Sequence, residues 1–204
     1  MKFSEIEIAL EVFKKGNPII VVDDVSRENE GDIIFPADTA TQEKINFCIT
    51  HAKGLVCIAI DNNTADRLRL EPLQSNKKDK FHTAFYEPID GSKLNGITTG
   101  ISAKERSITA KLVSNPNSVP HDFIKPGHLF PVVAKRHGVL ERDGHTEAGV
   151  DLCKITDHAP AAIICEIINE DGLMMRREEL EIFSKKNAPS TGCSFSTTHT
   201  LGFV

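Results

Sequence analysis

Apolar and polar positions along the chain follow two periods, one typical of amphipathic helices and one of buried strands. Apolar residues at helical spacing, with a stop at Gly16, predict a helix over residues 5–15. Continuous apolar runs predict strands at 18–23, 33–35, 55–60, 83–89, 128–134 and 161–168. Further helices are expected at 42–52, 64–70, after Ser102, at 147–153 and at 177–186. Strands mixed with covering helices predict an α/β layered domain.

Three connections between these elements have distinct compositions. Residues 74–80 are polar and basic without periodicity, which predicts a solvated surface loop. Residues 115–127 hold three prolines and predict an ordered connection without a helix. A glycine- and threonine-rich turn at 96–102 leads into a helix through a Ser102/Glu105 capping box. Such a turn is either a plain helix cap or an anion site.

Length and composition restrict the class of protein. With 204 residues, 40% hydrophobic and 26% charged, the chain is expected to form one globular domain over 1–204. The net charge of -5 argues against a nucleic-acid surface. No apolar run suits a membrane span or a secretion signal, so we expect a cytoplasmic protein. Five cysteines without a CxxC pair predict reduced thiols.

The segment 23–32 concentrates charge directly after the first predicted strand. It holds one arginine, Arg27, and five carboxylates: Asp23, Asp24, Glu28, Glu30 and Asp32. Carboxylates this close raise one another's pKa unless a counter-charge relieves them, and a hard divalent cation would do so. The segment is therefore either a solvated acidic turn or a cation site.

Several polar residues outside the segment 23–32 are also candidates for a functional site. Glu166 interrupts an apolar strand, so it either reaches water at a sheet edge or is used. His145, just before a helix, is a helix cap or a metal or proton ligand, and His128 is a rim histidine or a functional one. Arg142 and Thr146 suit phosphate oxygens. Unless these are unrelated surface charges, they predict a site for a phosphorylated, oxygen-rich small molecule with a divalent ion.

Five motifs occur in the order found in one enzyme family. They are 27–32 (RENEGD), 98–103 (TTGISA), 126–128 (PGH), 144–148 (GHTEA) and 165–167 (CEI). With them the chain resembles the 3,4-dihydroxy-2-butanone 4-phosphate synthases of riboflavin biosynthesis, from about residue 4 to about residue 189. The resemblance implies a three-layer α/β domain around a mixed, twisted sheet, and a homodimer with active sites at or near the subunit contact. It also implies a lyase that converts D-ribulose 5-phosphate to L-3,4-dihydroxy-2-butanone 4-phosphate and formate with Mg²⁺ or Mn²⁺ and no organic cofactor.

The resemblance also assigns roles to individual residues. Glu28 and His145 are similar to the family's metal ligands. His128 and Glu166 correspond to positions essential for catalysis, and we add Glu30 to this catalytic group. The substrate-binding positions are Arg27, Glu28, Asp32, Arg142, Asp143, Gly144, His145, Thr146 and Glu166. Asp23 and Cys57 are expected as secondary contacts, with Cys57 acting mainly in core packing.

Two segments depart from the family pattern. Residues 74–82 match weakly, and residues 190–204 form an atypical tail in place of the family's final strand and amphipathic helix. Nothing in the chain resembles the GTP cyclohydrolase II domain that is sometimes fused to this family, so we expect the single-function form. Two other functions remain open, a catalytically silent sugar-phosphate binder and a metal-dependent sugar-phosphate isomerase.

Overall fold

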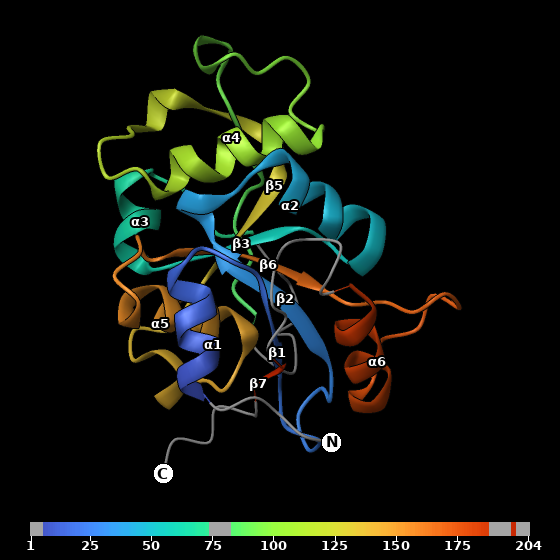
Figure 1. Ribbon diagram of the computed structural model, residues 1–204. Helices are drawn as coiled ribbons and strands as arrows, with labels where there is room; N and C mark the ends of the chain where they lie inside the picture. Colours follow the sequence, from blue (N-terminus) through green and yellow to red (C-terminus); the bar gives the residue numbers. More distant parts are fainter. Residues whose placement is uncertain (1–5, 74–82, 188–196, 199–204) are drawn as a thin grey trace.

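The fold is built on one mixed β-sheet. The computed structural model describes residues 6–73, 83–187 and 197–198 (Figure 1). Its seven strands lie in the order β4-β5-β3-β6-β2-β1-β7. Their bounds are β1 Ile19–Val22, β2 Gly31–Pro36, β3 Cys57–Ile60, β4 Ile89–Gly91, β5 Phe123–Val133, β6 Ala161–Glu166 and β7 Thr197–Thr198.

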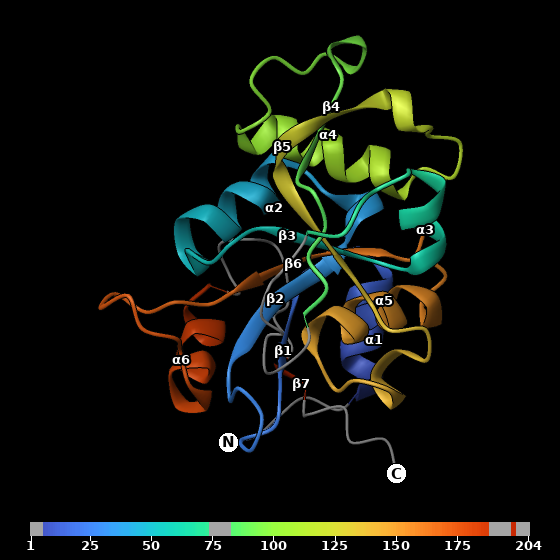
Figure 2. The same ribbon diagram turned by 180° about the vertical axis from the view of Figure 1, so that it is seen from behind.

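Both parallel and antiparallel pairs occur in the sheet, which confirms the predicted mixed topology. β3 pairs in parallel with β5, and β1 with β7. The pairs β1–β2, β2–β6, β3–β6 and β4–β5 are antiparallel. Figure 2 shows the twist, with β5 crossing the direction of β2. The central strands are buried along their whole length, because helices cover both faces of the sheet.

The helices form a layer on each face, so the expected three-layer α/β architecture is confirmed. On one face lie α2 (Gln42–Phe47), α3 (Asn62–Arg67), α4 (Ala103–Ser114) and α6 (Arg177–Asn187), whose apolar residues share a core with Ile33, Phe35 and Ile58. On the other face lie α1 (Ile6–Lys14) and α5 (His145–Ile155), packed on Ile34, Ala59 and Ile164 (Figure 1). Alternate residues of each strand supply the two cores, as the pleat requires.

Several predicted bounds were wrong, each for a local reason. The predicted helix 42–52 changes after Phe47 into a π-helical turn, η2 (Cys48–Ala52), which ends at the left-handed Lys53. The short helix predicted at 64–70 is α3, which begins earlier because Asp61 caps it by accepting from the Thr64 N–H at 2.9 Å. In the expected strand 83–89, Phe85 and Tyr86 make only isolated bridges, and β4 begins at Ile89.

The proline-rich connection at 115–127 was also placed wrongly in part. The segment was expected to contain no helix, but it holds a short 3-10 helix, η4 (Pro120–Asp122). From Phe123 on it belongs to β5, which carries Pro126 where the strand is irregular. The predicted loop 74–80 lies outside the described residues, as does most of the tail 190–204. Of that tail the structure describes only β7, which adds a short parallel strand beside β1. In the part of the chain described, no helix has the length and apolar character that crossing a membrane requires.

Candidate active site

A polar pocket opens on the sheet face that carries α1 and α5. It lies at the carboxyl end of β6 and the N-terminus of α5 and is lined by Arg27, Glu28, Glu30, Asp32, Cys57, Thr83, Phe85, Val132, Arg142, His145, Thr146, Ile164 and Glu166. Eight of these residues were predicted to belong to the site from the sequence. The fold therefore gathers residues from six separate segments of the chain into one pocket.

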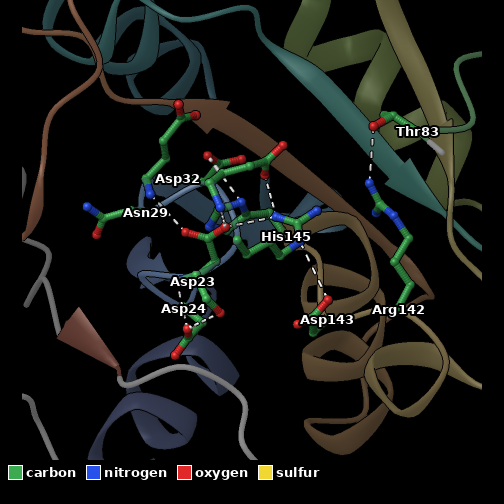
Figure 3. A network of polar contacts seen from close by, with 12 residues as sticks. Asp23, Asp24, Asn29, Asp32, Thr83, Arg142, Asp143 and His145 are labelled. Carbon is green, nitrogen blue, oxygen red and sulfur yellow. Dashed lines mark hydrogen bonds and ion pairs between the residues drawn. The ribbon is translucent and has the colours of Figure 1, made fainter. Parts of the chain in front are cut away.

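The acidic loop after β1 is organised by one buried carboxylate, Asp23. This carboxylate accepts the backbone N–H groups of Glu28 at 3.0 Å and Glu30 at 2.8 Å, and the Arg27 guanidinium at 2.9 Å. Asn29 takes a left-handed conformation with φ of 54°, which closes the loop between these two donors. The loop is thus a folded turn around Asp23, which lies close to Asp32 and His145 (Figure 3). Arg27 and Glu28 of this turn line the pocket.

Arg27 connects the acidic loop to the loop before α5. Its guanidinium is nearly buried between Asp23 and Glu28, and its Nε lies 3.6 Å from Oδ1 of Asp143. Asp143 itself is largely exposed at the rim of the pocket. The arginine therefore neutralises part of the carboxylate charge and keeps the two loops together.

His145 is the first residue of α5 and is buried against the acidic loop. Burial lowers the pKa of its imidazole to about 4, so the ring is neutral at pH 7. Its Nδ1 lies 3.7 Å from Oδ1 of Asp32, and its buried Nε2 has no hydrogen-bond partner among the described residues. A neutral imidazole with a bare buried nitrogen is the form that binds a metal ion.

The residues around His145 fit a divalent cation. One ligand atom each from Asp23, Glu28 and His145 lies within 4.8 Å of the other two. Carboxylate oxygens and one imidazole are a suitable donor set for Mg²⁺ or Mn²⁺. The cluster contains both predicted ligands, Glu28 and His145, and adds Asp23, whose carboxylate oxygens already accept three hydrogen bonds.

Two carboxyl groups face each other at the end of the sheet. Asp32 on β2 and Glu166 on β6 are directly paired in the antiparallel register, so both side chains point to the pocket face. Burial, and then the charge of Glu166, raise the pKa of Asp32 well above its ordinary value. Burial also raises the pKa of Glu166, whose Oε2 accepts the Leu55 N–H at 2.9 Å. Glu30 at the pocket wall likewise has a raised pKa, through burial and the nearby Glu28. All three carboxyl groups therefore hold a proton more readily than an ordinary exposed carboxyl group does.

Arg142 and the N-terminus of α5 form the opposite wall. Buried Glu147 accepts from Arg142 at 2.6 Å and from the Lys135 N–H at 2.9 Å, while Arg142 also donates to the Thr83 hydroxyl at 3.1 Å. Gly144 caps α5, and a Cβ there would lie 2.4 Å from Nη1 of Arg142. Together with Thr146 and the free N–H groups of the first helical turn, this wall suits an anionic group.

Three features of this region were missed or left open by the sequence. Glu147 lies in the motif 144–148 but was given no role, because a glutamate in the first turn of a helix is common. Thr83 lay in a predicted strand. Cys57 lies in the wall, where burial raises the pKa of its thiol, so it packs as a neutral group as expected.

His128 lies apart from the pocket within one chain. It is not among the pocket-lining residues that the structure describes, although β5 runs from it to Val132 in the wall. Its partly exposed ring contacts Asp90 instead, with Nδ1 2.7 Å from the carboxylate. Within the described chain, Glu166 lines the pocket and His128 does not, so the structure of one chain does not bring the two together in one site.

The turn before α4 was open between a plain cap and an anion site, and the structure favours the cap. The carboxylate of Glu105 accepts the N–H and hydroxyl of Thr98 and the hydroxyl of Ser102, and the Ser102 hydroxyl in turn accepts from the Glu105 N–H. These hydrogen bonds lower the pKa of Glu105 to about 2. The glutamate thus occupies the donors that an anion would need.

The fold and pocket together define a class of protein, a three-layer α/β protein with an acidic, cation-type site beside an arginine wall. Residues 7–192 match the model of the 3,4-dihydroxy-2-butanone 4-phosphate synthase family, and the chain belongs to that family. The resemblance drawn from the five motifs is thereby confirmed.

Individual relatives agree with this assignment. The chain is 54% identical over 178 residues to the riboflavin biosynthesis protein RibBA of Bacillus cereus (strain B4264), covering 87% of this chain and 44% of that protein. It spans about half the length of the curated relatives it matches. The Candida albicans 3,4-dihydroxy-2-butanone 4-phosphate synthase structure superposes with a TM-score of 0.86 at 40% identity, covering 98% of this chain and 95% of that one. A synthase structure in complex with two magnesium ions has a TM-score of 0.86 at 32% identity, covering 97% and 94%.

Proposed function

We propose that this chain is a lyase of riboflavin biosynthesis that converts D-ribulose 5-phosphate to L-3,4-dihydroxy-2-butanone 4-phosphate and formate. The observation that carries the proposal is the single pocket in which a cation-type cluster, a carboxyl pair and two arginines meet. These are the groups that an oxygen-rich sugar phosphate and its proton transfers require. All of them come from one sheet and its helices, which supports a single domain.

Glu28 and His145 are the proposed ligands of a Mg²⁺ or Mn²⁺ ion, with Asp23 holding the loop that presents Glu28. When bound, such an ion supplies electrostatic stabilisation to negative charge on adjacent sugar oxygens. The support is the neutral His145 imidazole within the acidic cluster, whose buried Nε2 has no hydrogen-bond partner among the described residues. The magnesium complex of the related synthase points to the same class of ion. No organic cofactor is part of the proposal.

We assign substrate binding to the wall formed by Arg142 and the N-terminus of α5. Arg142, fixed by Glu147, and the hydroxyl of Thr146 suit the phosphate, with Gly144 giving a backbone approach at the start of α5. Arg27 and Asp143 close the rim between the two loops. A phosphate held here leaves the sugar hydroxyls facing the acidic side of the pocket.

The proton transfers are assigned to the carboxyl groups of the pocket. Asp32 would contact the sugar hydroxyls, and Glu166 would take the C3 proton of the ketose, since burial raises its pKa and makes it a stronger base than an ordinary carboxylate. Glu30 and His128 are assigned to the later transfers that water loss and formate release require. The direct pairing of Asp32 with Glu166 supports this, because it places the two carboxyl groups next to each other on the pocket face of the sheet.

We propose further that the functional unit is a homodimer. His128 lies away from the pocket, on a sheet region whose exposed residues include Ile124. A second copy seated on this surface would bury Ile124 and bring one subunit's His128 toward the other's pocket. Analytical ultracentrifugation is expected to give twice the mass of the chain for the wild type and a monomer for Ile124→Asp. A monomeric wild type with full activity would exclude the dimer.

The product assay separates the proposed function from its two rivals. Purified protein is incubated with D-ribulose 5-phosphate and Mg²⁺, with an EDTA-treated sample beside it, and followed by ¹H and ³¹P NMR. Formate and a four-carbon phosphate that both require the metal are expected. An isomeric pentose phosphate without formate would indicate the isomerase, and binding without any product would indicate the silent relative.

A further inference from the structure

Asp90 and His128 form a pair that stands outside the pocket. Nδ1 of His128 lies 2.7 Å from Oδ2 of Asp90, and Oδ1 of Asp90 accepts the backbone N–H of His128 at 2.9 Å. The carboxylate is 3% exposed, whereas the imidazole is 44% exposed. Both oxygens of one buried carboxylate are therefore directed at a single residue whose ring reaches the surface.

The backbone of β4 and β5 is irregular where Asp90 contacts His128. The β4–β5 register shifts between Ile89, which opposes Leu129, and Asp90, which opposes Ile124, so residues 125–128 bulge out of the ladder. Bulges of this kind re-aim a side chain and are frequent next to active sites. Gly127 allows the close approach, because a Cβ there would lie 2.1 Å from the Ile89 carbonyl carbon.

The turn before α4 covers Asp90 from the other side. Gly100 has φ of +84°, and a Cβ on it would lie 1.9 Å from Oδ2 of Asp90. Glu105 fixes this turn through the hydrogen bonds to Thr98 and Ser102. Two of the family motifs, 98–103 and 126–128, thus converge on a carboxylate that lies in neither.

We propose that Asp90 is the positioning residue of His128, which holds the imidazole as the Nδ1–H tautomer with Nε2 directed outward as the proton acceptor. The proposal deepens the proposed function, since it rests on His128 acting in the lyase reaction. An ionised carboxylate only accepts hydrogen bonds, so Nδ1 must carry the proton that faces it. When Nε2 takes a proton from the substrate or water, the ring becomes an imidazolium beside Asp90, and the proton returns from Nε2 later in the cycle.

The isosteric variant Asp90→Asn separates this role from simple packing. A carboxamide can donate to Nδ1, and Nε2 then carries the proton and can no longer accept one, as happens when the aspartate of a serine-protease triad becomes asparagine. The side-chain volume and the acceptor for the His128 N–H are both retained. Asp90→Asn is thus expected to change the tautomer of His128 and to lower kcat while leaving the fold intact.

The first readout is ¹⁵N NMR of the full chain labelled at histidine, with His128→Asn used to assign the signal. In the wild type we expect a protonated Nδ1 and a bare Nε2 at His128. In Asp90→Asn we expect the reverse. A wild-type His128 with a bare Nδ1 would overturn the proposal, and this measurement needs no turnover.

The second readout is steady-state kinetics of formate release. Asp90→Asn is expected to lower kcat by about 10²- to 10⁴-fold, the range of a lost acid–base group, with KM within about threefold. The double variant with His128→Asn should be no slower than His128→Asn alone, because the two residues act as one unit. Losses that multiply, or an unchanged kcat in Asp90→Asn, would overturn the proposal.

Asp61→Asn is the matched control, since Asp61 also accepts a backbone N–H, from Thr64 at 2.9 Å, but serves only as the cap of α3. Its kcat is expected to match the wild type. The two proposals fail in different ways. If the wild type releases no formate, the proposed lyase function is wrong. The ¹⁵N NMR spectrum of His128 still shows whether Asp90 fixes the tautomer. If the wild type is active and Asp90→Asn equally so, only the positioning role falls.

Discussion

At the scale of single residues, some buried side chains beside the pocket fix the position of pocket residues through hydrogen bonds and ion pairs. Glu147 is the clearest case, a 1% exposed carboxylate that accepts from Arg142 at 2.6 Å and from a backbone N–H. A buried charge needs such partners, since an unpaired one is costly. Arg142 is thereby fixed before any substrate arrives, which is the preorganisation that tight binding requires.

Glu147→Gln is predicted to weaken substrate binding more than it slows the reaction. The carboxamide keeps the shape but loses the charge that aligns Arg142, so KM for D-ribulose 5-phosphate should rise about tenfold, with kcat within a few-fold. Stability should fall by about 1–3 kcal/mol, the usual cost of leaving a buried charged group poorly paired. Kinetics and urea unfolding measure both effects. The exposed neighbour Glu141→Gln is the control, and equal KM values for the two variants would contradict the prediction.

At the scale of elements, the N-termini of two helices position important polar side chains. α5 begins at Gly144 and presents His145 and Thr146 to the pocket, while α4 begins at a turn locked by Glu105. The pKa of Glu105 is about 2, against an ordinary value of 4.5. A group with a lowered pKa stabilises the fold above its ordinary pKa and loses that effect as the pH falls toward the folded value.

Glu105→Gln is therefore predicted to destabilise the protein at pH 7 and progressively less below about pH 4.5. The difference in urea midpoint between wild type and variant should shrink from pH 5 to pH 3, because the unfolded carboxyl binds a proton in this range while the folded one, with its pKa of about 2, stays ionised. Glu7→Gln, an exposed glutamate in the first turn of α1, is the control and should show no such trend. A difference that stays constant with pH would show that the charge of Glu105 is not what holds the turn.

The elements also show how far sequence reasoning reaches. Apolar runs such as Ile163-Ile164 located the central strands, because burial on both faces leaves a strong signal. The β4–β5 bulge could not be predicted, since it depends on how two strands 30 residues apart settle against the 98–103 turn. Asp90 was missed for the same reason: in the sequence it is one acidic residue at the end of an apolar stretch, 38 positions from His128.

At the scale of the whole molecule, the family motifs named most of the polar residues that line the pocket but did not show how they are arranged. Three segments that the resemblance named, 27–32, 142–146 and the one ending at Glu166, meet in one pocket, and the Asp32–Glu166 register brings two of them directly together. His128 is the exception, placed on a surface that the pocket of the same chain does not reach. No single-chain pattern contains that information, since the proposed complement is a second copy.

The measurement that tests the central claim most directly is formate release by Glu28→Gln beside Glu11→Gln, both with saturating Mg²⁺ and D-ribulose 5-phosphate. Glu28 belongs to the cation cluster, whereas Glu11 is an exposed residue of α1, so the two substitutions remove the same charge in different places. We predict that Glu28→Gln releases formate at least 10²-fold more slowly with an unchanged circular dichroism spectrum, while Glu11→Gln matches the wild type. Equal rates in the two variants would contradict the assignment of this pocket as the active site.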